Sequence, residues 1–374
     1  MKRTDLAIVL ALAASAAAAK PILVINEDND HYFKLSSERM NEASLKAYVD
    51  DICRGAVTHF FMCPQGQRAS FDSKTWEPIW KGLDEPDTEG RTNNIWCVNA
   101  KKLFDAGIDP YRVWIARVRE RGVSPWMTMR MNDVHFCAIS NYFRNTTFHK
   151  SHPEWRCVPN ATNGWEELSL DYSRREVYDY HLAMAKELLD RYDIDGLELD
   201  WMRFTRHLTP GRERELSGVL TSFMRRCRAH VDEAARRRGH PILVSARVPT
   251  TYAEARSRGF DPETWAREGL IDWLITTNFY DTNDFEIDVA DWTRRLAAAN
   301  PRVRVFPGAS DNLKKDGQGC PIPMTAADFS RWSGEMRRRG ATGLYLFNVP
   351  YLPEDVRTFV YGGMEESKCL KDRE

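Results

Sequence analysis

Residues 192–204 read Tyr-Asp-Ile-Asp-Gly-Leu-Glu-Leu-Asp-Trp-Met-Arg-Phe and follow a long amphipathic run. The pattern predicts a short buried strand, because Leu197 and Leu199 alternate with Glu198 and Asp200. Successive side chains of a strand point to opposite faces, so the two carboxylates share one face and finish at the carboxyl end of the strand. Carboxylates are almost never buried unless they are paired or used in chemistry. The stretch therefore predicts a functional strand end.

Strand-like and helix-like segments alternate along the rest of the chain. Continuous apolar strands, each followed by a helix, are typical of a parallel sheet that is covered on both faces. Eight such units predict an α/β fold with a single (β/α)8 TIM barrel. An open doubly wound sheet is the alternative, but no Gly-x-Gly-x-x-Gly turn follows the first strand. The expected strands are 21–25, 57–63, 123–131, 196–201, 242–248, 273–279, 303–306 and 343–347, and the helical regions are 42–54, 98–121, 174–191, 212–238, 262–268, 289–299 and 326–339.

Two connections are much longer than the others. Residues 64–95 and 136–168 follow the second and third expected strands and are rich in polar and aromatic side chains. Loops of this length in a compact domain are usually functional, and the carboxyl ends of barrel strands carry the active site. We expect both loops to wall the barrel mouth and to present an indole face from Trp76, Trp80, Trp155 or Trp165.

The amino terminus has the pattern of a secretory signal peptide. Residues 1–19 combine a short basic start, an apolar core and small residues before Lys20. The barrel domain is then residues 20–374, exported to the periplasm or the extracellular space. No later apolar run has the length of a membrane span.

Composition restricts the partners. The chain has 53 basic and 54 acidic residues and a net charge of −1, which does not favour nucleic acid or an anionic membrane. The eight cysteines are scattered without Cys-x-x-Cys spacing, so no metal or cofactor is expected. Cys97, Cys137 and Cys157 are the likeliest disulfide partners after export. The oligomeric state stays open.

Polar and aromatic side chains gather directly after the expected strands. Sugars present hydroxyl groups around apolar ring faces, so carboxylates, amides and flat aromatic rings suit them as ligands. A carbohydrate substrate is therefore expected. The candidate binding residues are Asp30, Arg130, Asn132, Asp133, His135, Trp201, Arg203, Arg247, Asn278, Tyr280 and Asn348.

Four motifs carry a family resemblance. Residues 130–135 (Arg-Met-Asn-Asp-Val-His), 152–155 (His-Pro-Glu-Trp), 170–172 (Leu-Asp-Tyr) and 195–204 resemble the glycosyl-hydrolase-like family 10 barrels, which are exported bacterial proteins. The resemblance spans roughly residues 20–360. It implies a barrel fold and a carbohydrate substrate, but not a specific reaction.

A weaker similarity is to the family-18 chitinases, whose fourth strand reads Asp-Gly-x-Asp-x-Asp-Trp-Glu. Asp195, Gly196, Asp200 and Trp201 match that pattern, and residues 278–281 (Asn-Phe-Tyr-Asp) are similar to the sixth-strand motif. Met202 stands where those enzymes have the catalytic acid, so their substrate-assisted chemistry is disfavoured. The α-glycosidases that place an Asp nucleophile at the end of strand four are a better analogy.

These observations predict an exported glycoside hydrolase that acts on a poly- or oligosaccharide. Asp200 is expected as the nucleophile or charge stabiliser and Asp281 as the general acid/base. Cleavage needs two carboxyl groups, about 5–5.5 Å apart for retention or about 6.5–9.5 Å for inversion. Glu198, expected to fix Arg203 or Arg247, is the alternative second carboxylate, and Asp133 is a third candidate.

Two alternatives belong to other classes. A non-catalytic saccharide-binding TIM barrel would keep the aromatic platforms and the hydrogen-bonding groups without a matched acid/base pair. A metal-dependent hydrolase ranks last, because the sequence pattern offers no obvious cluster of His and Asp ligands.

Overall fold

The computed structural model describes residues 21–83, 94–139, 142–278, 282–283, 285–313 and 321–364. Eight parallel strands close into a barrel in the order β1-β11-β8-β6-β5-β4-β3-β2, which confirms the (β/α)8 prediction. They are β1 (Ile22–Glu27), β2 (His59–Met62), β3 (Ser124–Arg130), β4 (Gly196–Asp200), β5 (Leu243–Val248), β6 (Trp273–Thr277), β8 (Arg304–Ala309) and β11 (Gly343–Phe347). A small second sheet contains β7 (Thr282–Asn283), β9 (Asn312–Leu313) and β10 (Ile322–Pro323).

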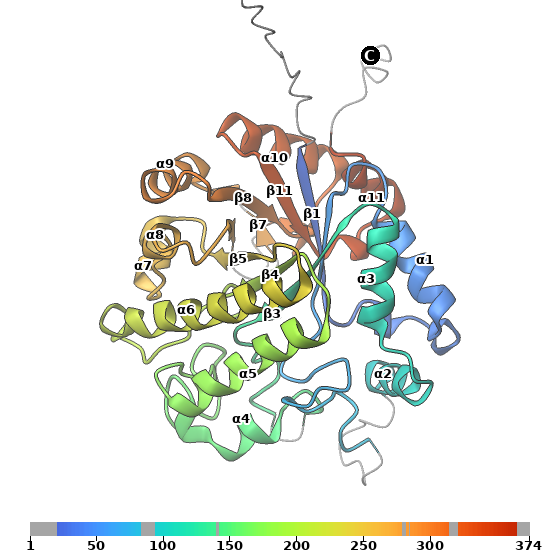
Figure 1. Ribbon diagram of the computed structural model, residues 1–374, viewed down its shortest axis with the longest axis horizontal. Helices are drawn as coiled ribbons and strands as arrows, with labels where there is room; N and C mark the ends of the chain where they lie inside the picture. Colours follow the sequence, from blue (N-terminus) through green and yellow to red (C-terminus); the bar gives the residue numbers. More distant parts are fainter. Residues whose placement is uncertain are drawn as a thin grey trace, which may run out of the picture.

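Helices surround the barrel on its outside (Figure 1). The region 98–121, expected to contain one helix, holds two, because Gly107 adopts φ +70° and Asp109 caps a new helix that starts at Pro110. The helices are α1 (Glu42–Ile52), α2 (Ile95–Asp105), α3 (Pro110–Glu120), α4 (Thr147–Ser151), α5 (Arg175–Arg191), α6 (Glu213–Arg238), α7 (Tyr252–Ser257), α8 (Pro262–Arg267), α9 (Val289–Ala299), α10 (Ala326–Arg338) and α11 (Glu354–Tyr361).

Strand alternation divides the apolar side chains into two groups. Leu197 and Leu199 belong to the large cluster between the sheet and the helices. A separate cluster fills the barrel interior with Val24, Phe61, Trp126, Trp273, Ile275, Phe306, Tyr345 and Phe347. Because Glu198 and Asp200 have the opposite parity to the two leucines, they extend toward this interior.

Aromatic stacking fills the interior below the carboxylates. The Trp126 ring stacks on Phe61 and on Trp273, each with a centroid distance of 4.5 Å. Gly196 makes room for that ring, since a Cβ atom there would lie 2.3 Å from Trp126 Cδ2. The first residue of β4 must therefore be glycine for the aromatic layer to form beneath Glu198 and Asp200.

The segments after β2 and β3 extend beyond the helical ring, at the lower edge of Figure 1. They are held together by hydrogen bonds from Arg68 Nη2 to the Asn145 carbonyl at 2.9 Å and from Gln67 Nε2 to the His135 carbonyl at 3.2 Å. Because β2 and β3 are parallel, the two segments that follow them leave from the same end of the barrel, where the candidate site residues lie.

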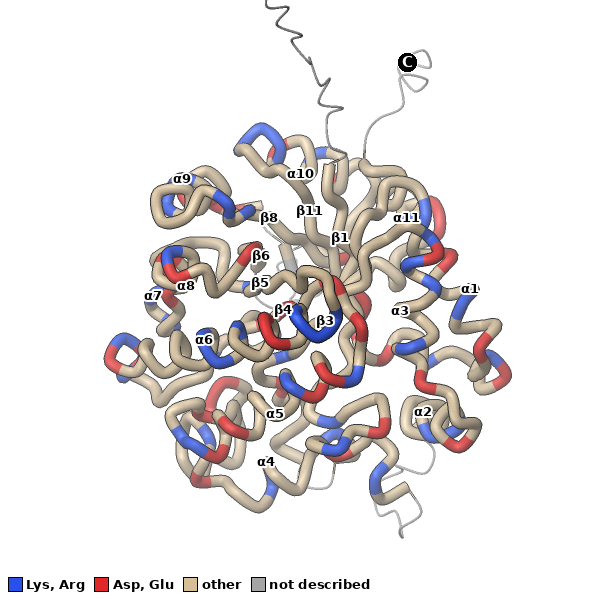
Figure 2. Tube along the Cα trace, in the orientation of Figure 1, with Lys and Arg blue, Asp and Glu red and all other residues tan. Residues whose placement is uncertain are grey.

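The outer surface carries both signs of charge. Acidic and basic residues are interspersed over the helices in Figure 2. Within the described residues, none of the helices combines the length and the apolar character needed to cross a lipid bilayer. The predicted signal peptide, residues 1–19, lies outside the described residues.

The disulfide expectation is not met. Cys137 and Cys157 are free and buried. Cys97 is buried in α2 rather than in a loop.

We expect Gly196→Ala to lower the free energy of unfolding by about 1–3 kcal/mol, the usual cost of overpacking a core. The added methyl group meets the Trp126 ring, which is itself held between two other rings. Gly218→Ala in α6 is the matched control, because a Cβ atom there has no neighbour within 4 Å. Chemical denaturation of both variants measures the difference. Equal stability of the two variants would contradict the packing argument.

Candidate active site

Glu198 lies inside the barrel and is fully buried. Its Oε1 atom accepts hydrogen bonds from the hydroxyls of Thr128 on β3 and Tyr345 on β11, both at 2.9 Å. Asn26 Nδ2 on β1 lies at 3.5 Å from the same atom. The Oε2 atom has no hydrogen-bond partner among the described residues. These hydroxyls, rather than the expected arginines, are the hydrogen-bond partners of Glu198.

The surroundings of Glu198 favour its neutral form. Burial, followed by the nearby charge of Asp200, raises the pKa of Glu198 from its ordinary 4.5 to about 8, although Arg247 and the two hydroxyls oppose the shift. The protonated form of Glu198 is therefore favoured, and its proton can occupy Oε2, the oxygen without a partner among the described residues.

Asp200 lies at the carboxyl end of β4 and is 3% exposed. Its Oδ1 accepts the backbone N–H of Met202 at 2.9 Å, and its Oδ2 accepts Arg247 Nη1 at 3.1 Å. Arg247 is itself positioned by Thr277 Oγ1, at 3.0 Å from Nε, and by the Phe347 ring, whose centroid is 4.1 Å from the guanidinium carbon. Asp200 is thus oriented by one guanidinium and one peptide.

A second group of charges surrounds Arg130 at the end of β3. Arg130 donates to Asp28 and, at 2.7 Å, to Asp133 Oδ2. His135 Nδ1 lies 2.7 Å from Asp133 Oδ1, and Arg203 Nη2 lies 3.4 Å from His135 Nε2. Burial alone would raise the pKa of Asp133, but His135 and Arg130 hold it well below its ordinary value. The structure thus brings Asp28 together with four predicted site residues, which are Arg130, Asp133, His135 and Arg203.

Trp201, predicted to bind substrate, packs in the core of the structure. Its side chain is fully buried and contacts the rings of His207, Phe223 and Trp265 at centroid distances of 4.9, 5.8 and 6.3 Å. The chain leaves β4 at Asp200, so the alternation that points Asp200 inward no longer applies to the next residue.

The amide of Asn132, also predicted to bind substrate, forms hydrogen bonds with the backbone of the surrounding chain. Its Nδ2 donates to the carbonyls of Leu170 and Arg206 at 3.1 and 3.0 Å, and its Oδ1 accepts Leu170 N–H at 3.0 Å. With Nδ2 also 3.0 Å from His207 Nδ1, little capacity is left for a ligand.

The remaining predicted residues are spread over other strand ends. Asp30 follows β1 and is buried, and Asn278 follows β6 and is half-buried. Asn348 follows β11 in the left-handed region with φ 62°, and its Nδ2 is 3.4 Å from Ser310 Oγ. Tyr280 and Asp281 lie outside the described residues, so the acid/base assignment of Asp281 stays a prediction.

Among the four tryptophans expected as platforms, Trp165 is the most exposed, at 53%. Its ring contacts Phe204 edge-on at 5.8 Å, and Phe204 in turn contacts His135 at 4.9 Å. Trp76 is buried against Tyr180, and Trp155 stacks on His152. The exposed indole of Trp165 is therefore connected, through Phe204 and His135, to the charged group around Arg130.

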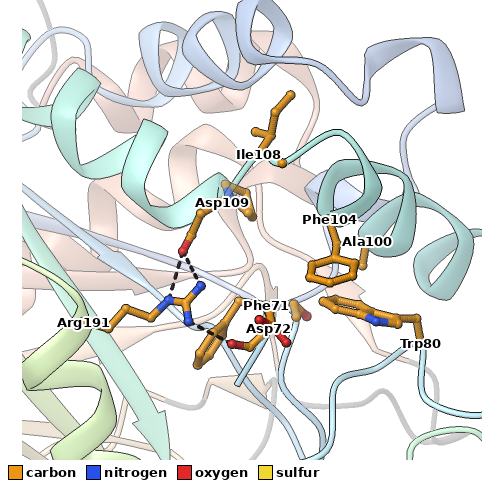
Figure 3. A pocket seen from close by; sticks show the side chains of 11 residues that line it. Phe71, Asp72, Trp80, Ala100, Phe104, Ile108, Asp109 and Arg191 are labelled. Atoms are coloured by element: carbon orange, nitrogen blue, oxygen red, sulfur yellow. Dashed lines mark hydrogen bonds and ion pairs between the residues drawn. The ribbon is translucent and has the colours of Figure 1, made fainter. Parts of the chain in front are cut away.

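Trp80 lines a separate cavity of about 180 Å³ between the segment after β2, α2 and α3. In Figure 3 its ring faces Phe104, with a centroid distance of 5.1 Å. On the other side Arg191 binds Asp109 Oδ2 at 2.8 Å and the Asp72 carbonyl at 2.8 Å. None of the predicted site residues lines this cavity.

Several functional contacts were missed from the sequence. Thr128 and Tyr345 lie at inward-pointing positions of their strands, so the alternation of side chains on β3 and β11 could have identified them.

Asp28, Asp30 and His31 form a group that could hold a metal ion, with one ligand atom from each lying within 4.8 Å of the others. The expectation that no His and Asp cluster exists was therefore wrong. The signal for the cluster was the Asp-x-Asp-His spacing directly after β1.

No protein-family model and no curated protein matches this chain in sequence. Solved structures share its fold. The PgaB glycoside hydrolase domain from Bordetella bronchiseptica aligns with TM-score 0.55 at 11% identity, over 93% of this chain and 99% of that domain. An α-L-fucosidase, isoenzyme 2 from Paenibacillus thiaminolyticus, aligns with TM-score 0.53 at 11% identity, over 91% of this chain and 48% of the fucosidase. A family-138 enzyme that targets pectin rhamnogalacturonan II aligns with TM-score 0.50 at 10% identity, over 94% of this chain and 40% of that enzyme.

These structural neighbours are glycoside hydrolases, and the chain shares their barrel fold. Identities this low establish the fold and not the activity.

We expect Glu198→Gln to flatten the dependence of stability on pH. A folded-state pKa of about 8 against an ordinary 4.5 means that the contribution of Glu198 to stability is complete below pH 4.5 and is lost as the pH rises through 8. The loss is on the order of a few kcal/mol, at about 1.4 kcal/mol per pKa unit. Glutamine resembles the protonated acid and keeps the oxygen that accepts from Thr128 and Tyr345.

The measurement is Tm from pH 5 to pH 9 for wild type and variant. The difference in Tm between the variant and the wild type should grow with pH, and the variant should have the higher Tm at pH 8. Glu215→Gln, which alters an exposed carboxylate paired with Arg212, should give parallel curves. Parallel curves for Glu198→Gln as well would show that Glu198 is ionised in the folded protein.

Proposed function

We propose that this protein is an exported glycoside hydrolase of the glycosyl-hydrolase-like family 10 type, acting on a poly- or oligosaccharide. The observation that carries the proposal is the pair of inward carboxyl groups on β4, of which Glu198 is held neutral and Asp200 is bound to Arg247. Neighbouring carboxyl groups in unlike environments are typical of acid/base sites. The barrel fold, which the chain shares with known glycoside hydrolases, supports the same proposal.

Asp200 is proposed as the nucleophile or the charge partner of the anomeric carbon. Arg247 and the Met202 N–H fix its orientation, and each of its oxygens keeps a second lone pair for substrate. An oxocarbenium-like transition state gains positive charge, so a fixed carboxylate stabilises it more than it stabilises the ground state.

The other roles rest on the sequence and on position. Asp281 is proposed as the general acid/base that protonates the leaving oxygen. Glu198 is proposed as a positioning residue that keeps a second negative charge away from Asp200, because it is buried beneath it. The charged group around Arg130, with His135 and Arg203, is proposed to bind sugar hydroxyls.

One observation favours a second candidate, the non-catalytic saccharide-binding barrel. Both oxygens of Asp200 already accept hydrogen bonds from the protein, and the residue is almost fully buried. A purely structural Asp200–Arg247 pair would leave a barrel that binds sugars through its rim without cleaving them.

We expect Asp200→Asn to reduce turnover by several orders of magnitude, because a transition-state charge partner acts on the barrier, where each ~1.4 kcal/mol is tenfold. The assay compares an aryl glycoside carrying a good leaving group with an unactivated oligosaccharide. Asp281→Asn should impair the unactivated substrate more, because a good leaving group needs little protonation.

Turnover is measured per folded molecule, because removing one partner of the buried pair with Arg247 also costs stability. Asp193→Asn is the control, since that carboxylate pairs with Arg119 on the surface. Wild-type turnover in Asp200→Asn would refute the mechanism. Saccharide binding by a wild type that cleaves nothing on a broad glycoside panel would establish the binding barrel instead.

We expect Trp165→Ala to weaken saccharide binding by about 1–3 kcal/mol, the range for losing a large apolar contact. The exposed indole lies beside Phe204 and the charged group around Arg130. Isothermal titration with an oligosaccharide measures the change. Trp155→Ala, whose ring is covered by His152, is the comparison, and an equal effect of both replacements would remove the platform role from Trp165.

A further inference from the structure

We propose that Asp28, Asp30 and His31 bind one divalent transition-metal ion at the edge of the barrel mouth. One ring nitrogen of His31 and one carboxylate oxygen from each aspartate lie within 4.8 Å of one another. The three residues follow β1 directly, so the barrel fixes their backbone. The proposal does not rest on the glycosidase mechanism.

His31 points to a ligand independently of the acidic cluster. The residue is 5% exposed, and its Nε2 atom is buried without a hydrogen-bond partner among the described residues. A buried polar atom left unsatisfied is costly, and in a native protein it calls for an explanation. A metal ion on Nε2 supplies the missing partner.

The other side of the imidazole is arranged as it is in metal sites. Glu27 Oε2 lies 2.9 Å from His31 Nδ1, and Tyr48 donates its hydroxyl to Glu27 Oε1 at 2.7 Å. Histidine ligands of metals almost always donate their second N–H to a carboxylate or a carbonyl, which fixes the tautomer and the ring orientation. If Nδ1 donates its proton to the fully buried Glu27, the Nε2 lone pair can bind a metal ion.

An incoming ion has to compete with cationic side chains. Lys34 Nζ lies 2.5 Å from Asp30 Oδ2, and Arg144 Nη2 lies 3.5 Å from the same oxygen. The Lys34 side chain is 46% exposed, so its amine can move into water when an ion takes its place beside Asp30, which is itself buried. Asp28 remains tied to Arg130 through Oδ1, while its Oδ2 is 3.7 Å from Arg203.

A cavity of about 410 Å³ borders His31 and is lined also by Lys34, Tyr48 and Tyr351. The Tyr351 ring meets the imidazole edge-on at a centroid distance of 4.0 Å. An ion can therefore approach the histidine beside Lys34, whereas Asp28 and Asp30 do not line this cavity.

The donor set selects the class of ion. One imidazole and two carboxylates suit Zn²⁺ or Mn²⁺ better than Ca²⁺ or Mg²⁺, which are held almost entirely by oxygen ligands.

The test is isothermal titration of the chelator-treated full chain with ZnCl₂ and with MnCl₂. We expect one ion per chain for at least one of the two metals, with affinity reduced tenfold or more in His31→Ala and in Asp30→Asn. Glu27→Gln should weaken binding by about 10–100-fold through the histidine, as changes to such partners usually do. Lys34→Gln should strengthen binding, because it removes the competing amine from an exposed position.

His240→Ala is the matched control, since that surface imidazole also contacts a carboxylate, with Nε2 2.7 Å from Asp193. Circular dichroism checks the fold of every variant, and Lys34→Gln keeps the test decisive if His31→Ala does not fold. Absence of saturable one-to-one binding, unchanged affinity in Asp30→Asn, or an unchanged or lower affinity in Lys34→Gln would overturn the site. Glycosidase activity is not a readout, so failure here leaves the proposed function untouched.

Discussion

The stacked rings of Phe61, Trp126 and Trp273 fill the barrel interior, and the orientation of the strands depends on them. Burying these large rings fixes which parity of each strand points inward, because a shift of one residue would exchange the two faces. On β4 the inward positions are then Gly196, Glu198 and Asp200. The glycine admits the Trp126 ring, and the two carboxyl groups lie above it. The packing that closes the barrel is therefore what forces two acids into its interior.

A buried pair of acids two residues apart cannot carry two charges cheaply. The structure resolves the conflict by giving them different partners. Glu198 receives two hydroxyls and is held neutral, whereas Asp200 receives a guanidinium and a peptide N–H. Arg247 can take this position because Thr277 on the neighbouring strand β6 and the Phe347 ring on β11, across the barrel interior, support it. Residues on β3, β5, β6 and β11 thus determine the surroundings of the two carboxyl groups on β4.

Sequence alternation predicted the eight strands of the barrel and the face that Glu198 shares with Asp200, because period two holds as long as a strand continues. It failed where strands end. Trp201 and Asn132 come one and two residues after β4 and β3, where the chain turns, and both serve the packing of the surrounding loops. Asp28, Asp30 and His31 lie in the turn that directly follows β1. Their meeting depends on a fold of the chain that no periodicity describes.

The barrel shared with the PgaB domain leaves the chemistry to individual side chains, because a fold at 11% identity hosts many reactions. Here Arg247 orients Asp200 at the end of β4, while burial favours the neutral form of Glu198 beneath it. If Glu198 were ionised as well, Arg247 would be divided between two acids and would orient neither of them. In the proposed mechanism, the neutral form of Glu198 therefore leaves Arg247 to orient Asp200 alone.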